Sequence, residues 1–264
     1  MKIFYLGDIM GKPGRKVVVD HLKALREEYG VDFVVAQGEN LSHGKGMSLP
    51  NTEQMMAAGV DAFTGGNWTL KRPDINPWLE DPAKPVVRPA NYKEGTAGKR
   101  YKIVETPYGR VLIFSLLGQI VGAFEHEVDN PLKVADEILE ETKNDNLVAR
   151  VVNFHGDFSS EKLVIGQYLD GRATMVVGDH WHVPTADAEV QAGGTAHVTD
   201  VGMTGSRDSC LGIETRVIVQ RWLTGDPSRN ELETEGRMWL CGLLVDVDSK
   251  TGLAKSIQQI IKTW

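Results

Sequence analysis

Short apolar runs alternate with segments of helical periodicity along the first quarter of the chain. The runs at 2–6, 31–36 and 60–64 are rich in β-branched residues and stop at or near glycine, which is typical of buried strands. Between them, 15–28 places apolar residues on one helical face and 49–58 is also expected to be helical. Because strands separated by helices usually pair in parallel, this region predicts an α/β fold.

The rest of the chain predicts a more mixed arrangement. Segments 101–105 and 110–116 flank TPYG, which favours a hairpin. Further strands are expected at 147–154 and 173–177, on both sides of AGG within 191–195, and in a hairpin around DSKTG. Helices are expected at 131–143, at 160–169 with Ser159 or Ser160 as cap, and at 210–223, with Trp222 in a packed position. No linker rich in proline, glycine or serine divides 1–264, so we expect one domain with a mixed sheet or two stacked sheets.

Composition excludes several partners. The net charge of −7 gives extended nucleic acid or an anionic membrane little non-specific attraction to the protein. The N-terminal apolar run is too short for a signal peptide or a membrane span. Cys210 and Cys241 form no close pair, which argues against a disulfide framework or thiolate zinc site and favours a reducing cytoplasm.

Polar side chains follow five of the predicted strands at the point where each strand ends. They are Asp8, Glu39 with Asn40, Asn67, His155, and His180 with His182. The carboxyl ends of strands form the active-site rim of layered α/β folds. Singly, each residue has a structural explanation, such as a turn cap for Asp8 or a core position for His155. Repetition at five strand ends favours a common site.

The side chains at these strand ends suit a pair of metal ions. Imidazoles with carboxylate and amide oxygens match iron, manganese, zinc or cobalt better than calcium or magnesium. Two ions about 3.5–4 Å apart would activate a bridging hydroxide as nucleophile and neutralise charge on a phosphoryl group. In GDHWHV, His180 and His182 would share one side if the preceding strand continued through them.

The chain resembles the calcineurin-like metallophosphoesterases and, within them, the bacterial YmdB-like group, over nearly its whole length. The resemblance rests on GDIMGKPGR, GENLSHGKG, GGNW, RPANY with GTAGKRY, VNFHGDFSSEK, YLDGR, GDHWHVPTAD, GGTAHVTDVGMTG and RWLTGDPSR. It implies a four-layer α/β/β/α sandwich with mixed sheets, a dinuclear metal centre, and phosphodiesterase activity on cyclic nucleotides or similar small phosphodiesters. A homo-oligomer is a further implication.

The resemblance also implies a ligand set. One metal would be held by Asp8, Glu39 and His182, with Asn40 beside it. The other would be held by Glu39, Asn67, His155 and His180, so that Glu39 bridges the two. Iron or manganese is expected, with zinc as the alternative. Trp181 would face away or wall the substrate pocket.

Position 68 departs from the family pattern. The family usually reads Gly-Asn-His where this chain reads Gly66-Asn67-Trp68, and that histidine is expected to protonate the leaving group. An indole N–H is not acidic enough for this role. Three interpretations remain: activity persists with a good leaving group or with another acid such as His43; the protein binds a nucleotide without hydrolysing it; or Trp68 stacks on a base or sugar of a different substrate.

Two further departures lie near the expected site. Gln119 stands where relatives tend to carry arginine, which weakens its hold on an anionic substrate. In HGDFSSEK, Asp157 either orients His155 or caps the helix that follows. His126, in an acidic loop, is expected at the surface.

Three hypotheses of function follow. The leading one is a cytoplasmic dimetal phosphodiesterase whose usual acid is replaced by Trp68. The second is a nucleotide-binding regulator that keeps the metal site and has weak or no catalysis. The third is a structural protein stabilised by a single metal.

Overall fold

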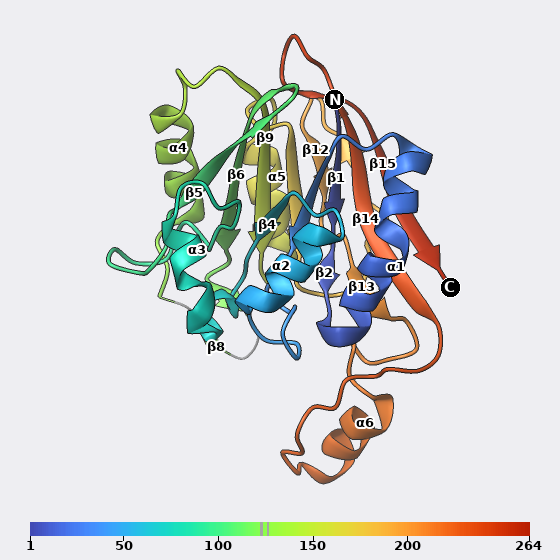
Figure 1. The fold of residues 1–264 in the computed structure, drawn as a ribbon. Helices are drawn as coiled ribbons and strands as arrows, with labels where there is room; N and C mark the ends of the chain where they lie inside the picture. The colour runs from blue at the N-terminus through green and yellow to red at the C-terminus, as the bar shows by residue number, and fades with distance from the viewer. Residues whose placement is uncertain (122–123, 126) are drawn as a thin grey trace.

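Two β-sheets lie face to face in the computed structural model, with helices on both outer surfaces (Figure 1). The structure describes residues 1–121, 124–125 and 127–264, and for residues 120, 121, 124 and 125 it describes the backbone alone. His126, for which we expect a surface position, lies outside the described residues.

The predicted strands and helices appear in the predicted order, and the structure adds short elements at 8–9, 76–80, 120–121, 124–125 and 203–206 that the sequence analysis does not predict. The strands are β1 (Lys2–Leu6), β2 (Asp8–Ile9), β3 (Phe33–Gln37), β4 (Ala62–Thr64), β5 (Tyr101–Thr106), β6 (Gly109–Leu117), β7 (Ile120–Val121), β8 (Phe124–Glu125), β9 (Leu147–His155), β10 (Met175–Asp179), β11 (Glu189–Val190), β12 (Ala196–Val198), β13 (Met203–Ser206), β14 (Met238–Val247) and β15 (Ala254–Thr263). The helices are α1 (Gly11–Tyr29), α2 (Leu49–Ala57), α3 (Asn76–Glu80), α4 (Pro131–Glu141), α5 (Ser159–Tyr168) and α6 (Thr215–Thr224), with short 3₁₀ turns η1 (Thr69–Lys71) and η2 (Pro73–Ile75).

Both large sheets contain parallel and antiparallel pairs. The seven-stranded sheet has the order β2-β13-β14-β1-β3-β4, with β15 added to β14. Within it, β1, β3 and β4 run parallel, and β14 is antiparallel to β1. The six-stranded sheet has the order β11-β12-β10-β9-β6-β5, in which the four central strands are parallel and both edge strands antiparallel. The expectation of two mixed sheets is therefore confirmed.

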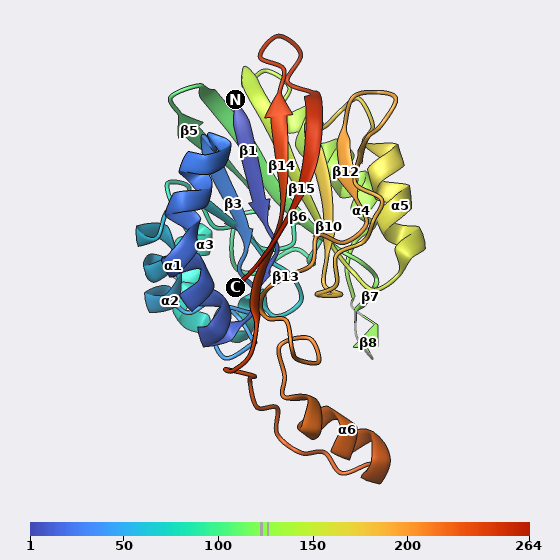
Figure 2. The same cartoon turned by 90° about the vertical axis from the view of Figure 1, so that its right-hand side faces the viewer.

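Three hydrophobic cores separate four layers. Alternation along β1 sends Phe4 and Leu6 toward α1 and α2, while Ile3 and Tyr5 point into the core between the sheets. A third core joins the six-stranded sheet to α4 and α5. Figure 2 shows α1, α2 and α3 on one side of the paired sheets and α4 and α5 on the other. This is the predicted α/β/β/α sandwich, which brings the strand ends of both sheets to a shared edge.

Three helix starts differ from prediction, and the first is α1, which begins at Gly11, four residues before the expected start at residue 15. The helix expected at 210–223 begins only at Thr215, because Leu211 and Gly212 adopt positive φ angles of 56° and 89°, which no α-helix accommodates. The N-cap of α5 is Phe158, so neither Ser159 nor Ser160 caps it. The errors at α5 and α6 concern the backbone just before a helix, where local sequence leaves several conformations open.

Helix α6 projects away from the sandwich (Figures 1 and 2). Trp222 is 87% exposed and Leu223 78% exposed, so the prediction that Trp222 occupies a packed position is wrong. The amphipathic pattern that favoured a packed position does not specify which partner covers the apolar face. Among the described residues, no helix combines the length and hydropathy needed to cross a membrane.

Candidate metal centre

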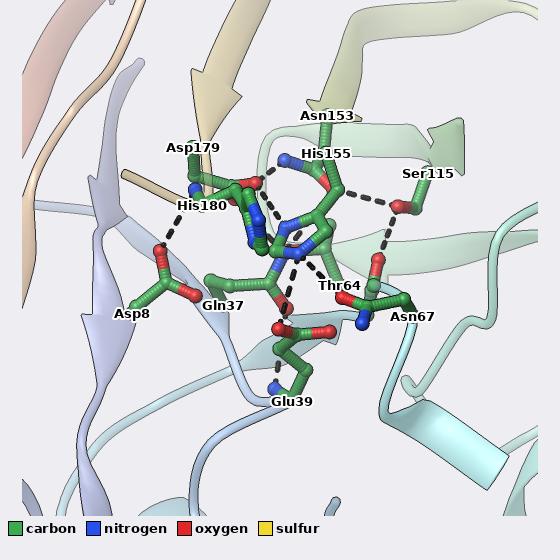
Figure 3. Close-up of polar contacts among 12 residues, drawn as sticks. Asp8, Gln37, Glu39, Thr64, Asn67, Ser115, Asn153, His155, Asp179 and His180 are labelled. Atoms are coloured by element: carbon green, nitrogen blue, oxygen red, sulfur yellow. Dashed lines mark hydrogen bonds and ion pairs between the residues drawn. The ribbon is translucent and has the colours of Figure 1, made fainter. Parts of the chain in front are cut away.

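The predicted strand ends converge at one edge of the sandwich (Figure 3). Asp8 opens β2, directly after β1, and His155 is the last residue of β9. The remaining predicted ligands lie in the loops after β3, β4 and β10; these are Glu39, Asn40, Asn67, His180 and His182. Because β1, β3 and β4 are parallel in one sheet and β9 and β10 in the other, their carboxyl ends deliver these groups to one place.

Glu39, His155 and His180 form the tightest group. One potential ligand atom from each lies within 4.8 Å of the others. Glu39 Oε1 is 3.0 Å from His155 Nε2, and the His155 and His180 ring centroids are 4.5 Å apart. Asn67 Oδ1 lies 3.1 Å from the same His155 nitrogen. Carboxylate, amide and imidazole atoms thus face one point, as a metal-binding cluster requires.

Asp8 and His182 form a second group beside the first. Asp8 Oδ1 is 3.9 Å from His182 Nε2, and Asp8 Oδ2 accepts a hydrogen bond from the His180 backbone N–H at 3.3 Å. Asp8 Oδ1 and Asn40 Oδ1 are buried without a hydrogen-bond partner among the described residues. Since a buried polar atom normally has a partner, two unpartnered oxygens in one site fit ligands of a cation.

Electrostatics agree with this donor set. Burial and the nearby Asp179 raise the pKa of the Asp8 carboxyl well above its ordinary value, which is the response of a carboxylate lacking a counter-charge. Burial and His155 lower the pKa of His180 to about 4, and burial also lowers the pKa of His182. Both imidazoles are therefore held neutral at pH 7, the form that binds a metal.

A buried network orients His155. Its Nδ1 lies 2.6 Å from Asp179 Oδ1, while Asp179 Oδ2 accepts from Gln37 Nε2 at 2.9 Å and Asn153 Nδ2 at 2.6 Å (Figure 3). This fixes the ring so that Nε2 faces the cluster. Burial alone would lower the pKa of His155, but Glu39 and Asp179 raise it well above its ordinary value.

Sequence reasoning missed Asp179 and considered Asp157 for this role. Asp179 neighbours His155 in the β9–β10 register, a contact that no local spacing reveals. Asp157 instead lies near the other histidine, with its Oδ1 3.2 Å from His180 Nε2. The one available signal was a carboxylate at the end of an apolar strand, directly before the histidine pair.

The strand before GDHWHV stops at Asp179 and does not continue through the histidines. His180 and His182 have φ angles of 100° and 61°, so they do not share one side of a strand. The Trp181 backbone N–H donates to Asp200 Oδ2, and its indole N–H donates to the Asp157 carbonyl oxygen. The turn therefore separates the two imidazoles, with His180 beside His155 and His182 beside Asp8.

A cleft of about 430 Å³ opens onto the cluster. Its lining residues are Glu39, Asn40, Trp68, Asp157, His180, Trp181, His182 and Leu211. Trp68 thus forms part of the wall, and its backbone N–H donates to Glu39 Oε2 at 3.0 Å. Two predicted residues lie elsewhere: His43 lines a larger neighbouring cleft, and Gln119 lines a separate hollow beside Glu161.

This fold and site define a metallophosphoesterase-type protein, and comparison with known proteins agrees. A family model described as YmdB-like protein matches residues 4–260, so the chain belongs to the YmdB-like family. The chain is 37% identical over 261 residues to the 2′,3′-cyclic-nucleotide 2′-phosphodiesterase of Bacillus subtilis, covering 99% of this chain and 97% of that protein.

Two solved structures share the whole fold. A novel phosphatase from Mycoplasma pneumoniae has a TM-score of 0.90 and 31% identity, covering 100% of this chain and 93% of that one. A hypothetical protein from Thermus thermophilus also has a TM-score of 0.90, with 34% identity and coverage of 100% and 99%. The chain is accordingly a phosphoesterase, and thus a hydrolase.

Proposed function

We propose that this protein is a dimetal phosphodiesterase that acts on cyclic nucleotides or similar small phosphodiesters. The observation that carries the proposal is the pair of buried, unpartnered oxygens of Asp8 and Asn40 beside the Glu39, His155 and His180 cluster. The named activity of the Bacillus subtilis relative supports the same substrate class.

The residues present fit two transition metals, iron or manganese first and zinc as the alternative. Asp8, Glu39 and His182 would hold one, with Asn40 beside it. Glu39, Asn67, His155 and His180 would hold the other, with Glu39 shared. Two such ions supply Lewis acidity, which polarises a phosphoryl oxygen and lowers the pKa of a water.

Protein groups around the cluster define the remaining chemistry. Asp179 holds His155 in position, and the Trp68 backbone N–H does the same for Glu39. Trp68 walls the cleft and supplies no proton to a leaving group, because its indole is not acidic. Diesters with a good leaving group, which departs without a proton, are therefore the substrates that this site hydrolyses fastest.

Metal content and a model diester test the proposal together. We expect about two iron or manganese ions per chain after purification or reconstitution, and turnover of bis-p-nitrophenyl phosphate with added manganese. A protein that binds neither metal would contradict the dinuclear centre.

The rival function is a nucleotide-binding regulator that retains the metals. Trp68, at the position of the usual acid, is the observation that favours it. Metal uptake without any turnover of bis-p-nitrophenyl phosphate would select the regulator, because that substrate needs no acid.

The number of domains, the cellular compartment and the oligomeric state are part of the same proposal. We expect residues 1–264 to form one domain and the protein to work in the cytoplasm, which two unpaired cysteines, Cys210 and Cys241, support. We also expect a homo-oligomer, for which the exposed Trp222 and Leu223 on α6 supply an apolar surface. Light scattering at several protein concentrations tests the assembly.

A further inference from the structure

A second, larger cleft of about 1170 Å³ lies beside the metal cleft. One wall comes from the loops after β3 and β4, with His43, Lys45, Lys71 and Arg72. The other wall comes from α6 and the segments that flank it; it includes Glu214, Arg221, Pro227, Ser228, Arg229, Asn230, Glu231 and Leu232. We call this space the basic cleft.

The charges in the basic cleft are unbalanced. Five of its lining side chains are cationic, and none of them forms an ion pair with a carboxylate of the described residues; they are Lys45, Lys71, Arg72, Arg221 and Arg229. Its two carboxylates, on Glu214 and Glu231, are each paired with Arg216 at 2.6 and 2.7 Å. Arg72 and Arg221 donate hydrogen bonds to neutral oxygens, which leave their charges uncompensated. In a chain of net charge −7, such a concentration of cations without a carboxylate partner favours binding of an anion.

The two clefts share their walls. Lys45, in the basic cleft, places its Nζ 4.4 Å from the ring centroid of Trp68, which lines the metal cleft. On the opposite wall, Leu211 lines the metal cleft and Leu232 lines the basic cleft, and the backbone bridge between Ile213 and Leu232 joins these segments. An anion in the basic cleft would therefore be separated from a phosphate at the metal centre by the side chain of Trp68.

We propose that the basic cleft is a second phosphate subsite, and that the substrate class is a dinucleotide or short oligonucleotide whose terminal phosphodiester reacts at the metal centre. This rests on the proposed function for the reacting group. Trp68 stands between the subsites, where the base of the nucleoside whose ribose joins two successive phosphates would stack on the aromatic ring. A mononucleotide leaves the basic cleft unfilled.

The first test compares two substrates that carry the same reacting group, a 2′,3′-cyclic phosphate, and differ in length. We would measure kcat/KM at low salt for 2′,3′-cyclic AMP and for ApA ending in a 2′,3′-cyclic phosphate, which adds one phosphodiester. The wild type should favour the dinucleotide at least tenfold, and Lys71→Gln/Arg229→Gln should reduce that ratio at least fivefold. Lys23→Gln/Lys133→Gln removes the same net charge from the exposed surfaces of α1 and α4 and should leave the ratio unchanged.

The second test measures binding without metals or turnover. Fluorescein-labelled pApApA would be titrated in EDTA at several salt concentrations and followed by anisotropy. Loss of two phosphate contacts in Lys71→Gln/Arg229→Gln should reduce the slope of log K against log salt by about 1.4, since each contact to a single strand contributes about 0.7.

The outcomes separate this proposal from the proposed function. The subsite proposal fails if both substrates have equal kcat/KM and the double variant changes neither that ratio nor the salt slope. This result leaves the proposed phosphodiesterase activity intact. Tight, salt-dependent binding of pApApA that the double variant weakens, with no hydrolysis of either substrate, overturns the phosphodiesterase and supports the subsite.

Discussion

At the scale of single residues, the proposed function has Trp68 limit which leaving groups the enzyme can expel. We expect Trp68→His to raise turnover of 2′,3′-cyclic AMP at least tenfold, because general acid help is typically worth about 10²–10⁴ in rate. Turnover of bis-p-nitrophenyl phosphate should change little, since its leaving group needs no proton. The backbone N–H that holds Glu39 remains in the variant.

Steady-state kinetics on both substrates check this, with Trp68→Phe as the control that changes the ring without adding an acid. If Trp68→His and Trp68→Phe turn over 2′,3′-cyclic AMP equally, the role assigned to position 68 is wrong.

Asp179 acts through His155. We expect Asp179→Asn to weaken manganese binding about 10–100-fold, as loss of a partner that orients a metal-binding histidine typically does. The new amide N–H₂ would also face the amide donors of Gln37 and Asn153, which now bond to the carboxylate. Titration calorimetry with manganese measures the effect.

The matched control is Asp136→Asn, which alters a surface carboxylate bonded to Tyr168 and Arg172. Unchanged manganese affinity in a folded Asp179→Asn protein would show that the network does not support the metal site.

The sequence predicts the site residues that follow a strand end and does not predict those that meet through pairing between strands. Strand ends are visible as apolar runs that stop, so the groups at Asp8, Glu39 and His155 can be assigned to one edge from the amino-acid sequence alone. The partner of His155 cannot, because Asp179 meets it only through the lateral register of β9 and β10. The position of His43 was also not predictable, because the sequence does not show which way a loop turns. His43 is a candidate acid by its place after Glu39, but its loop carries it into the neighbouring cleft.

At the scale of elements, a buried ion pair ties α5 to the turn that carries both histidines. Lys162 Nζ donates to Asp200 Oδ2 at 2.8 Å and to the Asp179 carbonyl oxygen at 2.7 Å, and it lies 3.9 Å from the Trp181 ring centroid. Both charged side chains are fully buried. We expect Lys162→Met to lower the free energy of unfolding by about 3–5 kcal/mol, because the Asp200 charge stays buried without its cation.

Urea denaturation measures this loss, and Lys162→Met/Asp200→Asn should recover part of it by removing the unpaired charge. The exposed Lys133→Met on α4 serves as control and should stay within about 0.5 kcal/mol of wild type. A Lys162→Met protein as stable as wild type would refute the role of the pair.

Regular elements were predictable where periodicity is strong and less so where the backbone turns. The hairpin of β5 and β6 and the order of strands and helices follow from alternation and turn residues. The start of α6 does not follow from the sequence, because it depends on left-handed conformations at Leu211 and Gly212. A leucine within an amphipathic run gives no reason to expect such a conformation.

At the scale of the whole molecule, the candidate metal site lies at one edge of a sandwich that three separate cores hold together. We therefore expect chelation with EDTA to abolish diester turnover while the circular dichroism spectrum stays native. Thermal unfolding of 1–264 should remain a single cooperative transition, as expected of one domain, with a lower midpoint because bound metals stabilise only the folded state. Scanning calorimetry before and after EDTA, followed by recovery of turnover on adding manganese, makes the comparison. A protein that unfolds when its metal is removed, and that never hydrolyses the diester, would instead fit a single structural ion, because only then would the layers depend on the metal for their stability.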